Sequence, residues 1–238
     1  MRLAAGALLS VAAGCAAAGP QALTDPAQAR AQLVEIGSID PTICIDLRYS
    51  TKFNFLGEPI YGEPRAYLRR DAAERLARVQ SALALRGLGL KVWDAYRPLA
   101  AQRRMWALVP DERYVSNPQK GGRHTRGASV DVTLVDVHGR ELPMPTIFDD
   151  FTERAAVDAP APEVARRNRD LLRDAMAEGG FTVLSSEWWH YDADGWSALA
   201  PIDVALEALS GDTRYSKPAS KRDTTSTREV GAPLETAR

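Results

Sequence analysis

The segment SVDVTLVD, residues Ser129–Asp136, is the part of the chain that most restricts the fold. Apolar side chains at every second position predict a β-strand with one face in the core, formed by Val130, Val132 and Leu134. A glycine-rich stretch, GGRHTRGA, precedes this strand and contains His124, one of only three histidines in 238 residues. Asp131 follows this histidine by seven positions and lies on the other face of the strand. The sequence therefore predicts a rare histidine and a carboxylate near one another.

Other segments predict further strands and helices around this one. Strands are expected over residues 43–49, 90–95, 181–184 and 188–192, and helices over about residues 71–86, 99–108 and 163–178. Asp71 with Glu74 three positions later resembles a capping box at the start of the first helix. Because the connections between strands and helices are irregular, we expect an α+β fold. It would be a single domain with a mostly antiparallel sheet, helices packed around it and the functional site in a cleft.

The overall composition is that of an ordinary globular protein. Hydrophobic residues make up 45% of the chain and charged residues 26%, and 30 Lys and Arg nearly balance 31 Asp and Glu. The chain is long enough for one well-filled core. No extended basic stripe is present, so the sequence gives no indication of a nucleic-acid partner.

Both ends of the chain are expected to lie outside this domain. Residues 1–15 have a basic start and a short apolar run that ends at AAGC, which resembles a lipoprotein signal with Cys15 as the lipidated residue. Ordinary signal cleavage within CAAAGPQA is the alternative. We expect a linker over residues 16–33, the domain over 34–209 and a polar, disordered tail over 210–238. The protein would then be exported to the periplasm or cell envelope, with a lipid on Cys15 as its one membrane contact.

A second histidine lies in SSEWWHYD, where Glu187 precedes His190 by three positions. A catalytic zinc site requires three protein ligands and a free position for water, and His124, Asp131 and His190 would supply those ligands. Glu187 is the candidate general base for the water. Residues three apart in an ideal strand point to opposite faces, so Glu187 and His190 can converge only if the segment bends or begins in a loop.

Each of these residues also has a simpler interpretation. A single histidine is usually a surface or satisfied core residue, Asp131 could accept a hydrogen bond in a turn, and Glu187 could be solvated. Arg97, after the strand in WDAYRP, could stabilise negative charge beside a zinc-bound carbonyl, or it could form an ordinary ion pair with Asp94. We expect His138, in the turn DVHGRE, to be exposed and without a role.

Several segments together resemble the zinc D-alanyl-D-alanine dipeptidases of the vancomycin-resistance type. These segments are IDLRYSTKFNFLGEPIYG, VWDAYRP, RHTRGASVDVTL, FDDF and EWWHYD, and the resemblance spans about residues 36–195. It implies one zinc per chain held by His124, Asp131 and His190, Glu187 as general base and Arg97 as the transition-state cation. It also implies that Tyr49 and Asp149 hold the free amino end of the substrate, with Asp150 as the alternative carboxylate.

One position departs from the family pattern. The family often has a serine two positions before the first zinc histidine, where it contacts the substrate, and this chain has Gly122. The expected activity is hydrolysis of the D-Ala-D-Ala dipeptide in cell-wall metabolism. One alternative is a D,D- or L,D-carboxypeptidase or endopeptidase of the same group, acting on peptidoglycan stem peptides. The other is a non-catalytic, cell-wall-binding envelope lipoprotein.

Overall fold

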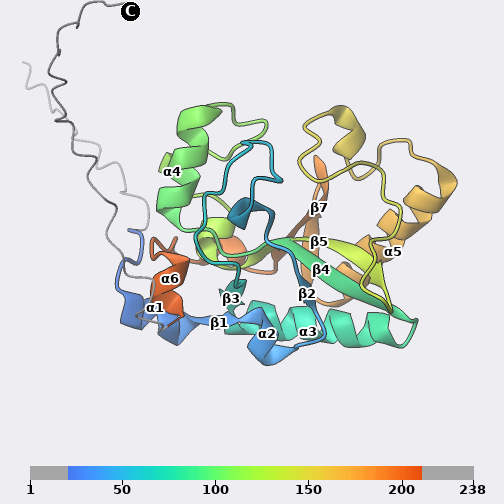
Figure 1. The fold of residues 1–238 in the computed structure, drawn as a ribbon, viewed down its shortest axis with the longest axis horizontal. Coiled ribbons are helices and arrows are strands. Elements are labelled where there is room, and N and C mark those ends of the chain that lie inside the picture. The colour runs from blue at the N-terminus through green and yellow to red at the C-terminus, as the bar shows by residue number, and fades with distance from the viewer. Residues whose placement is uncertain (1–20, 211–238) are drawn as a thin grey trace, which may run out of the picture.

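A computed structural model describes residues 21–210, and a five-stranded sheet forms its centre (Figure 1). The strands lie in the order β2-β4-β5-β7-β6. Their bounds are Cys44–Ile45 for β2, Leu88–Asp94 for β4, Ser129–Asp136 for β5, Phe181–Leu184 for β6 and Glu187–Ala193 for β7. Only the β2–β4 pair is parallel, so the predicted α+β fold with a mostly antiparallel sheet is confirmed.

Two long helices form one layer against this sheet. Helix α3 (Arg70–Ala84) packs against β4, helix α5 (Glu163–Glu178) packs against β5, β6 and β7, and the two helices contact each other. The predicted apolar face of α3 is buried, and it consists of Ala72, Leu76, Val79 and Leu83. In Figure 1, α3 runs along one side of the sheet, while helix α4 (Leu99–Leu108) and the long connecting loops lie on the opposite side.

A smaller unit closes the end of the domain near the N-terminus. Strands β1 (Leu33–Glu35) and β3 (Tyr67–Arg69) pair antiparallel, and helices α1 (Pro26–Gln32), α2 (Ile36–Ile39) and α6 (Leu206–Leu209) pack around them. Helix α1 lies in the segment expected as a linker, and Ala29 in it is fully buried. The packed part of the chain therefore begins before residue 34. The predicted signal segment with Cys15 and the tail after Ser210 lie outside the described residues.

Two local predictions were wrong. The expected strand over residues 43–49 is extended only at β2, and Arg48–Ser50 forms a 3₁₀ turn instead. In this turn, the Tyr49 carbonyl accepts hydrogen bonds from the amides of Ile60 and Tyr61, which ties the following loop to it. The expected capping box at Asp71 is absent: α3 begins at Arg70, and Asp71 accepts a hydrogen bond from Arg75 in the next turn.

No helix formed by residues 21–210 combines the length and the hydrophobicity that crossing a membrane would require.

Candidate metal centre

The register of three neighbouring strands places three polar residues in one row across the sheet. Asp94 at the end of β4 pairs with Asp131 of β5, and Asp131 pairs with His190 of β7. All three are buried, with exposed fractions of 3% or less. Buried charged groups need partners to offset their desolvation, so this row is a site for ion pairing or for a metal.

His124 joins this row from the 3₁₀ turn η3 (His124–Arg126), directly before β5. Its Nδ1 lies 2.8 Å from the Ala95 carbonyl, and its own carbonyl accepts the Arg97 amide at 3.2 Å. Gly127 ends the turn in the left-handed region, with φ of 67°, where a glycine has no steric penalty. The turn is therefore anchored to the end of β4, and it directs the imidazole towards β7.

Three side-chain atoms form a nearly equilateral triangle at this point. His124 Nε2 lies 3.1 Å from His190 Nδ1 and 3.3 Å from Asp131 Oδ1, and the last two atoms lie 3.0 Å apart. The sequence predicted these three residues as a ligand set, and the fold brings them together. Two nitrogen lone pairs and a carboxylate oxygen that face one another favour a shared cation.

The outer atoms of both imidazoles have partners that orient the rings. His124 Nδ1 donates to the Ala95 carbonyl, and His190 Nε2 lies 3.0 Å from Asp192 Oδ1. Asp192 also accepts a hydrogen bond from Ser129 at 2.6 Å and forms an ion pair with Arg123. With these outer nitrogens as donors, the inner nitrogens have free lone pairs, which is the usual arrangement around metal-ligating histidines.

The electrostatics of the triangle favour positive charge. Burial lowers the pKa of His190, but its contacts with Asp131 and Asp192 outweigh this effect and raise the pKa to about 10. Burial raises the pKa of Asp131, and the two histidines outweigh it, so that this pKa lies below its usual range. The carboxylates of Asp131 and Asp192 thus favour a positive charge between the three side chains, either a proton or a metal cation.

Glu187 lies beside the triangle without belonging to it. The β6–β7 register shifts where Leu184 pairs with Glu187, because Val183 already pairs with Tyr191 four residues further along β7. This irregularity supplies the bend that the sequence required, and Glu187 lines the same cavity as His190. Burial raises the pKa of Glu187, and the carboxylate has no hydrogen-bond partner among residues 21–210. It is therefore a partly buried carboxylate that is free to contact a ligand.

Arg97 forms the ion pair that was one of its two predicted interpretations. Its Nη2 and Nε donate to Asp94 Oδ2 at 2.6 and 3.1 Å, which confirms the ion pair, and its side chain also lines the cavity. Nη1 donates to Gln102 Oε1 at 2.7 Å. A guanidinium has five N–H donors, and these contacts use three, so two remain for a ligand.

Tyr49 and Asp149 meet at another wall of this cavity. The Tyr49 hydroxyl donates to Asp149 Oδ1 at 2.9 Å, and the Phe55 amide donates to Oδ2 at 3.4 Å. Desolvation raises the pKa of Asp149 to about 8, despite these hydrogen bonds. Asp149 has φ of 60°, the one positive value among non-glycine residues in the described region. Asp150 instead forms an ion pair with Arg154, so the predicted residue, and not its alternative, faces the cavity.

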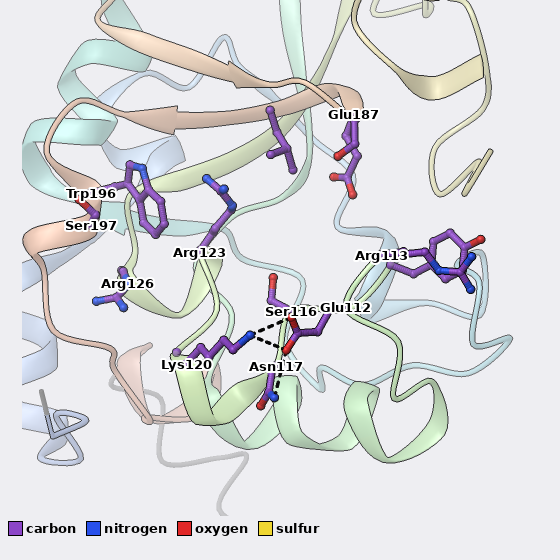
Figure 2. A pocket seen from close by; sticks show the side chains of 14 residues that line it. Glu112, Arg113, Ser116, Asn117, Lys120, Arg123, Arg126, Glu187, Trp196 and Ser197 are labelled. Carbon is purple, nitrogen blue, oxygen red and sulfur yellow. Dashed lines mark hydrogen bonds and ion pairs between the residues drawn. The ribbon is translucent and has the colours of Figure 1, made fainter. Parts of the chain in front are cut away.

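One cavity of about 50 Å³ is lined by the three residues of the metal triangle and by Glu187, Arg97, Tyr49 and Asp149. It adjoins an open pocket of about 420 Å³. Figure 2 shows this outer pocket, with Glu187 at one side and Arg123, Arg126 and Trp196 at another. The guanidinium carbon of Arg123 lies 4.6 Å from the centre of the Trp196 ring. His138 is exposed in its turn, as expected.

Sequence reasoning did not identify Gln102, Asp192 or Arg123 as part of the site. Asp192 carried a signal, because it follows His190 by two positions in a strand and so shares its face. Gln102 carried none, since its role depends on how helix α4 packs against Arg97.

Comparison with known proteins identifies the family. Residues 29–203 match the family model described as Peptidase M15, D-ala-D-ala dipeptidase. The chain belongs to this family. The D-alanyl-D-alanine dipeptidase of Escherichia coli (strain K12) is 42% identical over 162 residues, which cover 68% of this chain and 84% of that protein. That of Enterococcus faecium is 35% identical, over 61% of this chain and 83% of that protein.

Among solved structures, this M15 peptidase is similar to the LdcB LD-carboxypeptidase, with 19% identity and a TM-score of 0.37 over 56% of this chain and 61% of that one. The zinc-bound D,D-pentapeptidase VanY gives 16% identity and the same TM-score, over 56% of this chain and 76% of that one.

M15 peptidases are zinc-dependent, and the donor set of this chain fits zinc. Tetrahedral zinc with bonds of about 2.0–2.1 Å to nitrogen and oxygen places neighbouring ligand atoms roughly 3.3 Å apart. The sides of the triangle, between 3.0 and 3.3 Å, are close to this value. Two histidines and a carboxylate also leave the fourth position open, as a catalytic zinc requires.

Proposed function

We propose that this M15 peptidase hydrolyses the D-Ala-D-Ala dipeptide with one zinc per chain. The observation that carries this proposal is that the metal triangle and the Tyr49–Asp149 pair line the same small cavity. Asp149, once ionised, can pair with an ammonium one residue before the scissile bond, and the D-Ala-D-Ala dipeptide presents such an ammonium. The names of the relatives support the same substrate.

His124, Asp131 and His190 would hold the zinc. When bound, zinc supplies a Lewis acid that polarises the scissile carbonyl and lowers the pKa of a water molecule. Glu187 takes the proton from this water and passes it to the leaving amine. Because burial raises its pKa, Glu187 binds the proton more strongly than an exposed glutamate, which suits a base that must later act as an acid.

Arg97 stabilises the negative charge that develops on the carbonyl oxygen. Its ion pair with Asp94 fixes one edge of the guanidinium, and two of its N–H groups have no partner among the described residues. A cation already fixed in a dry site costs no reorganisation when the charge develops, which is why such groups contribute strongly to catalysis.

The amino and carboxylate ends of the dipeptide would occupy different parts of the site. The ammonium pairs with Asp149, and the Tyr49 hydroxyl keeps that carboxylate in place. The carboxylate end faces the outer pocket, where four cations outnumber two acids (Figure 2). The cations are Arg113, Lys120, Arg123 and Arg126, and the acids are Glu112 and Glu187.

The experiment that tests this proposal compares D-Ala-D-Ala with its N-acetylated form. Acetylation removes the ammonium and leaves Asp149 unpaired, and a hydrogen bond to a charged group contributes about 1.5–3 kcal/mol. We therefore expect kcat/KM to be about tenfold to a hundredfold higher for the free dipeptide. Asp149→Asn should reduce this preference, while Asp150→Asn, which alters a carboxylate outside the cavity, should leave it unchanged.

Two other results would change the assignment. Equal rates on the free and N-acetylated dipeptides would favour a carboxypeptidase or endopeptidase that acts on longer stem peptides, with the same zinc chemistry. Tight peptide binding without hydrolysis by the zinc-loaded protein would favour a non-catalytic envelope protein.

We also propose that the protein acts in the periplasm or cell envelope on peptidoglycan-derived peptides. The support is the N-terminal sequence, with its apolar run and Cys15. Lipidation of Cys15 would anchor the domain to the membrane through the lipid alone.

A further inference from the structure

Gln102 connects the cationic side chain of the site to a neighbouring loop. It lies on helix α4, is 1% exposed, and accepts a hydrogen bond from Arg97 Nη1 at 2.7 Å through its Oε1. Its Nε2 donates to the Ser116 carbonyl, also at 2.7 Å. Ser116 and Tyr114 line both the inner cavity and the outer pocket. One amide therefore links Arg97 to the loop that separates α4 from the metal-binding turn.

The contact with Gln102 limits the rotation of Arg97. Asp94 binds the Nε–Nη2 edge of the guanidinium, and Gln102 binds Nη1 on the other side. The Tyr61 hydroxyl also accepts from Nε at 3.3 Å, and Cζ lies 5.0 Å from the centre of the Tyr49 ring. Among the described residues Gln102 alone binds Nη1, so its loss would free that end of the guanidinium. The two N–H groups left for the substrate would then no longer have a fixed direction, and electrostatic stabilisation depends on that direction.

Gly122 supplies the space that Gln102 occupies. A Cβ atom at Gly122 would lie 3.3 Å from both Cδ and Oε1 of Gln102 and 3.4 Å from Thr125 Cγ2, closer than side chains normally pack. The backbone at Gly122 does not have the positive φ that favours glycine, so its conformation does not require this residue. The neighbouring amide therefore explains the glycine at the position where the family often has serine.

We propose that Gln102 is a positioning residue that sets the orientation of Arg97, and that Gly122 and Gln102 form a coupled pair. This inference rests on the proposed function, because Arg97 acts on the substrate only if the site is hydrolytic. Gln102 acts through Arg97 and needs no contact with the substrate.

The first test compares substitutions of Gln102. Gln102→Met keeps most of the volume but loses both hydrogen bonds, and we expect kcat to fall about tenfold to a hundredfold while KM changes little. Gln102→Glu keeps the acceptor for Arg97, and we expect its kcat to lie closer to that of the wild type. Zinc content should remain one per chain in both. Wild-type kcat in Gln102→Met would overturn the proposal.

Gln80 offers a matched control elsewhere in the fold. It is also a buried glutamine with two hydrogen bonds, from the Leu90 amide to its Oε1 at 2.8 Å and from its Nε2 to Thr42 Oγ1 at 3.1 Å. Gln80→Met should lower the melting temperature as Gln102→Met does but leave kcat unchanged. An equal loss of kcat in both variants would mean that general destabilisation explains the effect, and would also overturn the proposal.

The second test is a double-mutant cycle with Gly122→Ser and Gln102→Ala. The serine should lower kcat in the wild type, because it displaces Gln102, and should have little effect once Gln102 is alanine. Equal effects in both backgrounds would contradict the coupling. The same cycle can be measured through the free energy of unfolding, which tests the packing of this pair independently of enzyme activity. If the wild type does not cleave D-Ala-D-Ala, the proposed function fails separately, and the Gln102 variants are compared on the longer stem peptide that it does cleave.

Discussion

Asp131 and His190 are directly opposed residues on β5 and β7, and their side chains meet with Asp131 Oδ1 3.0 Å from His190 Nδ1. Cross-strand pairing in a buried sheet holds two ligands on rigid neighbouring backbones, so only His124 comes from a turn. Two of the three predicted ligands are thus held by the sheet itself.

Glu187→Ala should retain one zinc per chain and lose activity. Glu187 lies outside the triangle of donor atoms, and a general base contributes about 10²–10⁴-fold to turnover. The measurement pairs metal analysis with kcat on D-Ala-D-Ala. His190→Ala is the control and should lose the metal; if Glu187→Ala loses it equally, Glu187 is a ligand and not the base.

Asp192→Asn should weaken zinc binding while the domain stays folded. Asp192 Oδ1 accepts from His190 Nε2, and loss of such an outer carboxylate typically lowers metal affinity by about 10–100-fold. Competition with a chromogenic chelator would measure the change. Asp194→Asn alters an exposed carboxylate two residues along the chain and should bind zinc like the wild type. Unchanged affinity in Asp192→Asn would show that His190 needs no such support.

Asp149→Asn should change how the stability of the metal-free protein depends on pH. The pKa of Asp149 is about 8 in the fold, above its ordinary value of 3.8, so the folded state binds this proton more tightly than the unfolded state. The contribution of Asp149 to the free energy of unfolding is thus fully present below pH 4 and is lost as pH rises towards 8. The stability of Asp149→Asn relative to the wild type should therefore rise over this range. Denaturant unfolding of both proteins at several pH values measures this change. A difference in the free energy of unfolding that stays constant with pH would contradict the raised pKa of Asp149.

Cys15→Ser should move the protein from the membrane fraction to the soluble fraction, with unchanged kcat in the released domain. The reason is that the lipid would be the one membrane contact, and serine cannot carry it. Fractionation of cells that express each form makes the comparison. A wild-type protein found wholly in the soluble fraction would favour ordinary signal cleavage instead.

Much of the fold could be predicted because it depends on local periodicity. The strand Ser129–Asp136 and the helices Leu99–Leu108 and Glu163–Glu178 have the predicted bounds. Alternating apolar residues define the strand, Pro98 precedes the first of these helices, and Gly179 follows the second. The expected strand over residues 43–49 was wrong, because hydrogen bonds from Ile60 and Tyr61 to the Tyr49 carbonyl outweigh an alternating pattern. Those contacts come from a loop whose path the local sequence does not reveal.

The residues able to bind a metal could be predicted from the sequence, because histidine is rare in this chain and the motifs around His124 and His190 resemble those of one peptidase family. How these residues meet depends on the fold. Strand register opposes Asp131 to His190, and an irregular β6–β7 pairing turns Glu187 towards them. The fold also places Asp149, and not Asp150, at the cavity and brings Gln102 into contact with Arg97. These are contacts between segments distant in the chain, and they depend on register and packing, which a one-dimensional pattern does not contain.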